Sequence, residues 1–379
     1  MPEESSLLKT CISGTGLFTP PESVSNEDLV VAFNRFVDAE NARRASKIAS
    51  GEAAALQHSS AEFIVKASGI RSRHVVDRKG IIDPETMRPL IPLRPDDQPS
   101  LMAEMGLAAA REALQRAGRK PEDIDAVILA ASNFQRPYPA IAVELQHYLG
   151  CGGYAYDMNV ACASAAFGMQ AAVDAVARGS ARAALVVNVE ICTGHLTFRD
   201  RDCHFIFGDA ATASVIEPLA DARGERVFEI LGTRLRTQYS NNIRNNCGFL
   251  NPSEQPQRSA DDRLFRQEGR KVFKEVVPFA SELIVEHLAS LGVEPSSLRR
   301  LWLHQANLSM NQLIARRVLG REATVEEAPV ILDEYANTSS AGSVIAFHKF
   351  HADFSRGDVG VLCAFGAGYS AGSVVLRRS

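Results

Sequence analysis

The sequence has no apolar run long enough to cross a bilayer, and its opening residues do not form the pattern of a signal peptide. Its seven cysteines are odd in number and include no repeated Cys-x-x-Cys pair. These absences argue against a membrane protein and against a disulfide framework. We therefore expect a cytoplasmic protein with free thiols that does not associate with a membrane.

A large excess of charge of one sign is also absent, because 41 Lys and Arg residues oppose 45 Asp and Glu residues and leave a net charge of −4. This balance argues against nucleic acid as a partner. Four residues are candidate metal ligands by type and spacing: Cys192, His195, Cys203 and His204. Cys203 and His204 are adjacent in an extended run and point to opposite faces, so we expect neither a metal nor another cofactor.

Two short sequence motifs occur twice in the chain, in the same order, which indicates an internal duplication. Residues 118–129 share the positions of Gly, Pro and two aliphatic residues with residues 292–303, and residues 207–216 resemble residues 365–375. Strongly apolar strands alternate with helical patterns, which favours helix-covered α/β layers. With 379 residues, of which 46% are hydrophobic, the chain can bury two cores. We predict an N-terminal half over residues 1–218 and a C-terminal half over residues 228–379, related by a pseudo-twofold axis.

Two polar segments interrupt the first half. Residues 26–66 are helical in pattern, whereas residues 77–99 are rich in Pro, Asp and Arg and show little periodicity. Long surface segments of this kind tend to be functional lids or partner contacts.

Cys162 is the strongest candidate for chemistry. A short mixed strand ends at this cysteine, and an alanine-rich helical pattern follows at once and stops at Gly179. The partial positive charge of a helix N-terminus stabilises a thiolate, so we expect the pKa of Cys162 to fall and its sulfur to act as a nucleophile. The alternative is a buried cysteine that packs as a small hydrophobic residue.

Three further segments supply candidate partners for this sulfur. His304 follows an apolar strand, at the position where open α/β sheets place their sites. Asn337 lies in a loop of small residues, and Ala367 lies between two glycines, where a backbone amide can meet an oxyanion. Each residue also has an ordinary structural explanation. The ring nitrogens of His304 could simply be hydrogen-bonded to their neighbours, and Asn337 could cap a helix. The loop of Ala367 could be a plain hairpin turn.

Two chemistries use cysteine, histidine and asparagine in this chain order. A cysteine peptidase would require a Cys-Gly-Ser-Cys-Trp type of nucleophile segment, which is absent. A carbon–carbon condensing enzyme, in which cysteine is the nucleophile and the other two residues donate hydrogen bonds, fits better.

Four segments resemble the signature segments of β-ketoacyl-[acyl-carrier-protein] synthase III, a family of the thiolase superfamily: Asn159–Ser164, His304–Asn307, Tyr335–Ser340 and Phe365–Gly368. Residues 69–74 and 207–209 match further segments, so the resemblance covers essentially the whole chain. It implies an α/β fold of the five-layered thiolase type (αβαβα), built from two duplicated halves, and a homodimer. It also implies acyl transfer in two steps.

In that family the cysteine that matches Cys162 takes an acyl group from acyl-CoA and passes it to malonyl-acyl carrier protein, which loses CO2. The resemblance implies that neutral His304 and the Asn337 amide donate to the malonyl thioester oxygen. It further implies that the backbone amides of Cys162 and Ala367 hold the oxyanion of the acyl-enzyme step. A degradative thiolase would need a second cysteine near the last loop, and Cys363 lies on the strand before it.

The resemblance also implies binding residues. Tyr138, which the partner subunit would contribute, and Phe207 match positions of the acyl pocket. The positions that match coenzyme A contacts are Phe63, in place of a common tryptophan, Arg71 and Arg201. The positions that match the basic patch for acyl carrier protein are Lys274, Arg316 and Arg317. Arginines common in the family are replaced by Ala67 and Ser309.

Because the segments 26–66 and 77–99 are longer than in acetyl-starting members, we expect them to border the acyl tunnel and the starter to be of medium length. Two alternatives stay open. One is a non-catalytic partner subunit, although all three catalytic residues are present. The other is a condensing relative that uses a small-molecule acceptor in secondary metabolism.

Overall fold

In the computed structural model, which describes residues 7–379, nine strands form one continuous sheet in the order β11-β12-β13-β8-β1-β7-β6-β4-β5. Two short ribbons, β2–β3 and β9–β10, lie outside it. The strands are β1 (Thr10–Phe18), β2 (Glu22–Ser25), β3 (Ser72–Val75), β4 (Ala126–Ala130), β5 (Tyr154–Met158), β6 (Ala184–Ile191), β7 (Asp209–Pro218), β8 (Phe228–Ser240), β9 (Ile243–Asn245), β10 (Phe265–Gln267), β11 (Leu298–Leu303), β12 (Val359–Gly366) and β13 (Gly368–Arg378). The helices are α1 (Asn26–Arg43), α2 (Ala45–Ala49), α3 (Ala61–Ser68), α4 (Arg78–Ile82), α5 (Leu101–Ala117), α6 (Ile141–Leu149), α7 (Ser164–Ala177), α8 (Gly269–Ser290), α9 (Leu308–Leu319), α10 (Leu332–Tyr335) and α11 (Ala341–Lys349).

The nine strands divide into two groups with the same pairing pattern. In the first group β4 and β6 are parallel, and β7 pairs antiparallel with both β6 and β1. In the second group β11 and β12 are parallel, and β13 pairs antiparallel with both β12 and β8. The groups meet only where β1 pairs with β8, through Cys11 opposite Glu229 and Ile12 opposite Phe228. The predicted boundaries at residues 218 and 228 remain a prediction, and the link between β7 and β8 lies between them.

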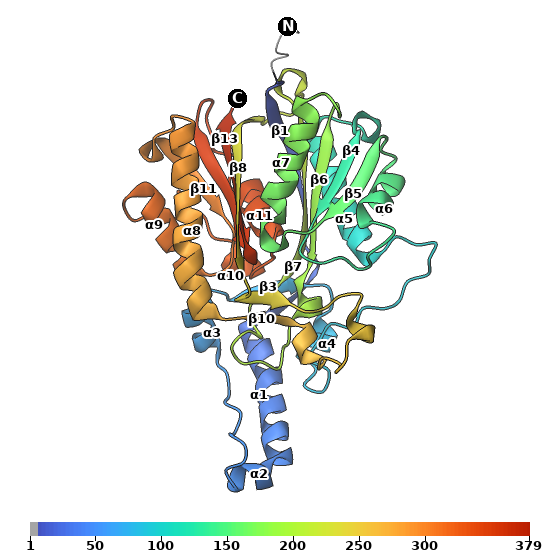
Figure 1. Ribbon diagram of the computed structural model, residues 1–379, viewed down its shortest axis with the longest axis vertical. Helices are drawn as coiled ribbons and strands as arrows, with labels where there is room; N and C mark the ends of the chain where they lie inside the picture. Colours follow the sequence, from blue (N-terminus) through green and yellow to red (C-terminus); the bar gives the residue numbers. More distant parts are fainter. Residues whose placement is uncertain (1–6) are drawn as a thin grey trace.

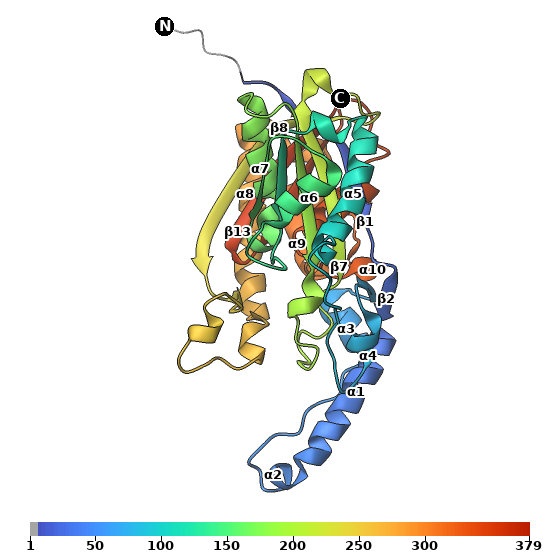
Figure 2. The ribbon, with the colours of Figure 1, turned by 90° about the vertical axis from the view of Figure 1, so that its right-hand side faces the viewer.

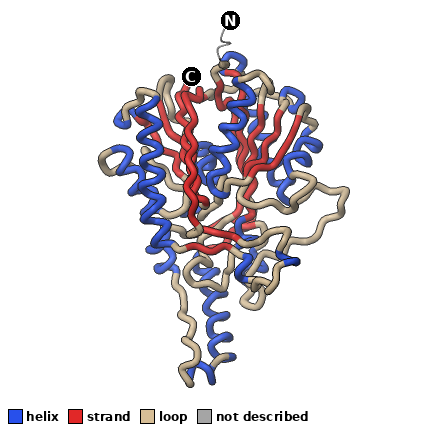
Figure 3. The backbone as a smooth tube through the Cα atoms, viewed as in Figure 1, coloured by secondary structure: helices blue, strands red, loops and turns tan. Residues whose placement is uncertain are grey.

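Helices cover this folded sheet in layers, as Figures 1 and 3 show. α7 and α11 lie between the two strand groups and share one apolar cluster with both. α5 and α6 pack on the outer face of the first group, and α8 and α9 pack on the outer face of the second. The arrangement is the predicted five-layered α/β fold, which places the N-terminus of α7 between the two halves.

The helix α5 is capped at both ends. Its N-cap, Ser100, accepts a hydrogen bond from the backbone amide of Ala103, and Gly118 ends it in the left-handed conformation with φ of 63°. Among the described residues, no helix combines the length and apolar character that a membrane crossing requires.

Residues 26–66 form an arm that projects from the layered body (Figures 1 and 2). Asn34 and Asn41 on α1 each exchange two hydrogen bonds with the returning chain, at Ser59 and Leu56, and so close the arm. The base of the arm, through Phe33, and the segment 77–99, through Ile81 and Met87, join one apolar cluster that also contains Phe207 (all buried). Both predicted segments therefore pack against the cluster that contains the predicted acyl-pocket residue, while the tip of the arm extends away from the body.

Candidate active site

The turn that carries Cys162 joins β5 to α7 and is held in an unusual conformation. Ala161 has a positive φ of 48°, which is uncommon for a residue other than glycine. The side chain of Asn159 accepts from the amide of Ala161 at 2.9 Å and donates to the carbonyl of Ser132 at 2.8 Å. Ser164 accepts from the amide of Val160 at 2.9 Å. These contacts hold Cys162 at the entry to α7, as the sequence predicts.

The predicted fall in the pKa of the Cys162 thiol is wrong. Burial raises this pKa to about 11, and the negative charge of Glu190 acts in the same direction. The hydroxyl of Ser339, which donates to the sulfur at 3.3 Å, and the backbone amides of Cys162 and Ala367 lower it, but by less than burial raises it. The thiol is therefore protonated at neutral pH, because desolvation outweighs the donors around the sulfur.

His304 lies immediately beyond the end of β11, where its backbone amide donates to the carbonyl of Cys363 at 2.8 Å. Its imidazole is buried, packs edge-on against Phe365, and has a pKa lowered to about 4 by burial. The ring is therefore neutral at neutral pH. The next residue, Gln305, accepts from the amide of Ile331 at 3.1 Å and holds the chain that leads to α10.

Asn337 lies in the loop between α10 and α11. Its side-chain oxygen accepts from the amide of Ser339 at 2.8 Å, and its own backbone amide donates to Ile206 at 2.9 Å. The oxygen is thus already engaged, which leaves the NH2 group to face the cavity. Ala336 and Ser339 have positive φ values of 54° and 48°. Strained backbone of this kind persists only where surrounding contacts enforce it.

The hairpin between β12 and β13 approaches the nucleophile closely. A Cβ atom placed on Gly366 would lie 2.6 Å from Cβ of Cys162 and 3.0 Å from its sulfur. Only glycine allows this approach, which brings the amide of Ala367 near enough to the sulfur to lower the pKa of the thiol.

One cavity of about 970 Å³ brings the predicted catalytic residues together, since Cys162, His304 and Asn337 all line it. Phe207 and Phe63 line it as well, and their predicted roles in the acyl pocket and in the coenzyme A site stay predictions. Its volume lies within the range of about 300–1,000 Å³ that is typical of ligand pockets.

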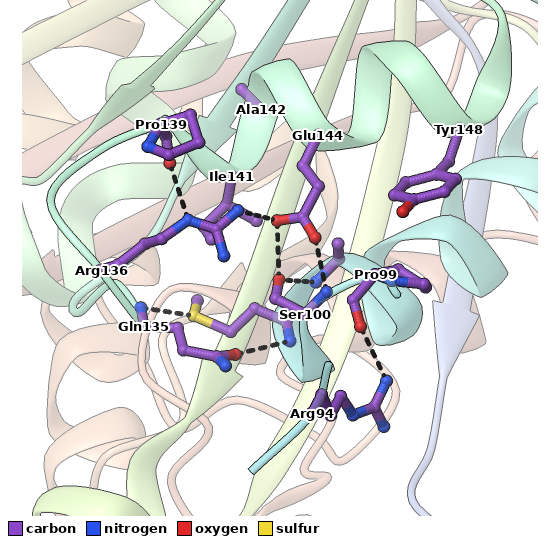
Figure 4. Close-up of polar contacts among 12 residues, drawn as sticks. Arg94, Pro99, Ser100, Gln135, Arg136, Pro139, Ile141, Ala142, Glu144 and Tyr148 are labelled. Carbon is purple, nitrogen blue, oxygen red and sulfur yellow. Dashed lines mark hydrogen bonds and ion pairs between the residues drawn. The ribbon is translucent and has the colours of Figure 1, made fainter. Parts of the chain in front are cut away.

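Tyr138 does not line this cavity within the chain, because its side chain is 81% exposed. Its loop is nevertheless firmly anchored. Figure 4 shows Arg136 and Ser100 directed at the carboxylate of Glu144, at 2.5 Å and 2.9 Å. Tyr138 is therefore exposed on the surface of this chain, and its predicted place in the acyl pocket of a partner subunit stays a prediction.

The other predicted binding residues lie at different distances from the cavity. Arg201 stacks its guanidinium on the ring of Phe63, 4.0 Å from the centroid, at the cavity wall. Arg71 is exposed and does not line the cavity. The predicted carrier-protein residues are exposed on two helices that pack together, Lys274 on α8 and Arg316 and Arg317 on α9.

Glu190 is a buried residue of the site that the prediction missed. Its carboxylate accepts from the amide and hydroxyl of Ser132, at 2.9 Å and 2.5 Å, and from the amide and hydroxyl of Ser340. It thereby connects the Cys162 turn, through Ser132 and Asn159, to the loop of Asn337. Burial raises the pKa of Glu190 to about 7. A single acid near the end of β6, in which Asn188 is the other polar residue, is the sequence signal that would have found it.

The ribbon β9–β10 is the second feature that was missed. Ile243 and Phe265 from its two strands line the cavity, and Phe265 packs edge-on against Phe207 with centroids 4.7 Å apart. The strands are only three residues long, too short to show an alternating pattern.

The comparisons with known proteins agree with this geometry. Residues 156–238 match the family described as 3-Oxoacyl-[acyl-carrier-protein (ACP)] synthase III, and residues 288–378 match its C-terminal region. The Beta-ketodecanoyl-[acyl-carrier-protein] synthase of Pseudomonas aeruginosa is 60% identical over 92% of this chain and 99% of its own length. A Beta-ketoacyl-[acyl-carrier-protein] synthase III of Methylococcus capsulatus is 29% identical over 97% of this chain and 98% of its own.

Solved structures give the same result. The 3-oxoacyl-[acyl-carrier-protein] synthase III of Aquifex aeolicus superposes with a TM-score of 0.75 at 26% identity, covering 97% of this chain and 99% of that one. The priming β-ketosynthase of the R1128 polyketide pathway gives a TM-score of 0.77 at 25% identity, covering 98% and 97%. The chain therefore belongs to the 3-oxoacyl-[acyl-carrier-protein] synthase III family, and it is a condensing acyltransferase of the thiolase superfamily.

Proposed function

We propose that this enzyme loads a medium-length acyl group from acyl-CoA onto Cys162 and condenses it with malonyl-acyl carrier protein to give a 3-oxoacyl-carrier protein. The observation that supports the proposal is the single cavity lined by Cys162, His304 and Asn337. The 60% identical relative is named for its β-ketodecanoyl product, and condensation adds the two carbons that malonate keeps. An octanoyl starter follows for that product.

In the first step, the sulfur of Cys162 attacks the thioester carbon of acyl-CoA. The amides of Cys162 and Ala367 hold the oxyanion that forms, since both already point at the sulfur. The intermediate collapses by breaking the carbon–sulfur bond of the donor. The departing coenzyme A thiolate receives the proton that Cys162 loses, so the exchange is balanced without another base.

In the second step, the bond between the malonyl carboxylate and the α-carbon breaks, CO2 leaves, and the electron pair forms a thioester enolate. The imidazole of His304 and the NH2 group of Asn337 donate to the enolate oxygen. A low pKa keeps His304 neutral, so it stabilises the anion without delivering a proton to it. The α-carbon then attacks the acyl group on Cys162, and the released thiolate takes a proton from solvent.

The proposed reaction needs no metal or cofactor apart from its two thioester substrates. Intact-protein mass spectrometry after incubation with acyl-CoA donors of increasing length tests it. The expected result is one acyl adduct on Cys162, most abundant with octanoyl-CoA and lost in Cys162→Ala. An enzyme that prefers acetyl-CoA would contradict the medium-length starter, and a chain that forms no adduct with any donor would be a non-catalytic subunit.

We also propose a homodimer. β5 ends the sheet, and its outer edge therefore offers unpaired backbone groups to a second chain. Tyr154 and Tyr156 stack side by side on this strand and are partly exposed, and Leu93 and Tyr138 are exposed as well. Sedimentation equilibrium should give twice the mass of the chain, and a monomer at micromolar concentration would contradict the proposal. The cytoplasmic setting stays a prediction from the seven free cysteines.

A further inference from the structure

Two arginines face each other across the β9–β10 ribbon. Arg244 and Arg266 are directly opposed in the antiparallel register, and both line the cavity that contains Cys162. Like charges in opposed positions destabilise a ribbon, so this pair carries a cost that an anion bound between the guanidinium groups would remove. Arg270, at the start of α8, lines the same cavity.

Ion pairs engage these three arginines only weakly among residues 7–379. Arg244 lies 3.9 Å from Asp262, whose carboxylate is already bonded to Arg258 at 2.8 Å. Arg266 and Arg270 form no hydrogen bond or ion pair with side chains of residues 7–379. Of the acids on the cavity wall, Glu268 pairs with Lys271 at 2.5 Å, and Asp200 and Asp202 form no ion pair with the three arginines among residues 7–379.

The arginines stand at the solvent end of the cavity. Arg270 is exposed and the side chain of Arg244 is 35% exposed, whereas His304 and Asn337 are buried. Phe63, on which the guanidinium of Arg201 stacks, lines the same cavity. The carrier of a thioester held at Cys162 would leave the cavity at its exposed end, where the arginines lie.

We propose that Arg244, Arg266 and Arg270 bind the phosphoryl group at the end of the pantetheine arm of the incoming thioester. This inference rests on the proposed function, because both coenzyme A and acyl carrier protein present their thiol on a phosphopantetheine arm. A guanidinium group binds phosphate oxygens through two parallel hydrogen bonds, and two opposed guanidinium groups can share one phosphoryl group. The three arginines thus bind the phosphopantetheine arm of the substrate and not its acyl chain.

The test compares acyl donors that differ only in phosphate. Octanoyl-CoA, octanoyl-3′-dephospho-CoA, octanoyl-phosphopantetheine and octanoyl-pantetheine are used to acylate Cys162 in the wild type, Arg244→Gln, Arg266→Gln and Arg270→Gln. Each variant should raise KM for the three phosphorylated donors by about tenfold and leave kcat, and the KM for octanoyl-pantetheine, unchanged. The matched control is Arg43→Gln, an exposed arginine on α1 that pairs with Glu40 and lies outside the cavity, which should behave as the wild type.

Other outcomes have distinct meanings. An equal loss with octanoyl-pantetheine, or no change with any phosphorylated donor, would overturn the inference. An effect confined to octanoyl-CoA, absent with the dephospho donor, would assign the arginines to the 3′-phosphate and would also overturn it. Failure of every donor to acylate the wild type would instead reject the proposed function. Because Arg266→Gln removes a like-charge contact, its Tm should not fall, and a large fall would indicate a structural role.

Discussion

The hydroxyl of Ser339 donates a hydrogen bond to the sulfur of Cys162 at 3.3 Å, although the two residues are 177 positions apart. Ser339 adopts a positive φ of 48° to make this contact, and its amide simultaneously donates to the side chain of Asn337. One strained residue therefore connects the proposed nucleophile to a proposed donor of the condensation step. In the proposed reaction, the same loop serves both steps.

Ser339→Ala should raise the pKa of the Cys162 thiol, because it removes one of the groups that lower it. A hydrogen bond of this kind contributes about 0.5–1.5 kcal/mol, so acylation should slow by roughly two- to tenfold. The rate of iodoacetamide alkylation against pH gives the thiol pKa directly. An unchanged alkylation profile would show that the hydroxyl does not act on the sulfur.

Glu190→Gln should lower the pKa of the Cys162 thiol, because the carboxylate charge raises it. Alkylation of Cys162 above pH 7 should therefore become faster. Condensation should become slower, since Ser132 and Ser340 lose an acceptor that orients two loops. Glu190→Asp keeps the charge and is the control. Faster alkylation in both variants would attribute the effect to loosened packing.

Glu190 should also affect stability against pH. Its folded pKa of about 7 lies above its ordinary value of 4.5, so between these values the native state binds more protons than the unfolded state. The free energy of unfolding should therefore fall by roughly 3 kcal/mol between about pH 4.5 and 7 on account of this group. Urea unfolding of the wild type and of Glu190→Gln at several pH values isolates the contribution of Glu190 to the free energy of unfolding. Parallel curves for the two proteins would contradict this assignment.

Asn337→Asp should separate the two steps of the reaction. The new carboxylate can still accept from Ser339, but it places a negative charge beside the enolate and raises the pKa of His304. Condensation should fall by about 10²–10³-fold, while acylation of Cys162 continues. The condensation rate should also become dependent on pH, unlike that of the wild type, in which His304 stays neutral above about pH 4. Equal losses in both steps would point to a collapsed loop instead.

Gly366→Ala should displace Cys162, because the added methyl group would lie 2.6 Å from Cβ of the cysteine. Acylation and condensation should both fall by at least about tenfold, without global unfolding. Gly248→Ala is a matched control, since a Cβ atom there meets no atom within 4 Å. Comparable activity of the two variants would show that the β12–β13 hairpin moves to accommodate the methyl group without displacing Cys162.

The sequence allowed prediction of what depends on local pattern. The apolar run before His304 and the small residues after Cys162 predicted a strand end and a helix start, and both are present. The thiol pKa was predicted wrongly, because burial raises it and depends on chain segments that are distant in the sequence, such as the one at Gly366, 204 residues away. Tertiary burial of this kind leaves no trace in a local window.

The ribbon that walls the cavity escaped prediction for a related reason. Strands of three residues are too short to show an alternation of polar and apolar residues. Arg244 and Arg266 become neighbours only because β9 pairs with β10 across the loop of residues 246–264. Glu190 was hidden in the same way, since four of its five donors come from Ser132 and Ser340 on distant loops. Which polar residues share a site was predictable only where a family resemblance supplied the answer.

The most direct test of the central claim is a single turnover of enzyme that already carries an octanoyl group on Cys162. Malonyl-acyl carrier protein is added, and CO2 and the 3-oxodecanoyl product are measured together. The account predicts equal amounts of both from the wild type, and acylated His304→Ala should release neither at a comparable rate. Transfer of the octanoyl group to the carrier without release of CO2, or undiminished condensation by His304→Ala, would contradict it.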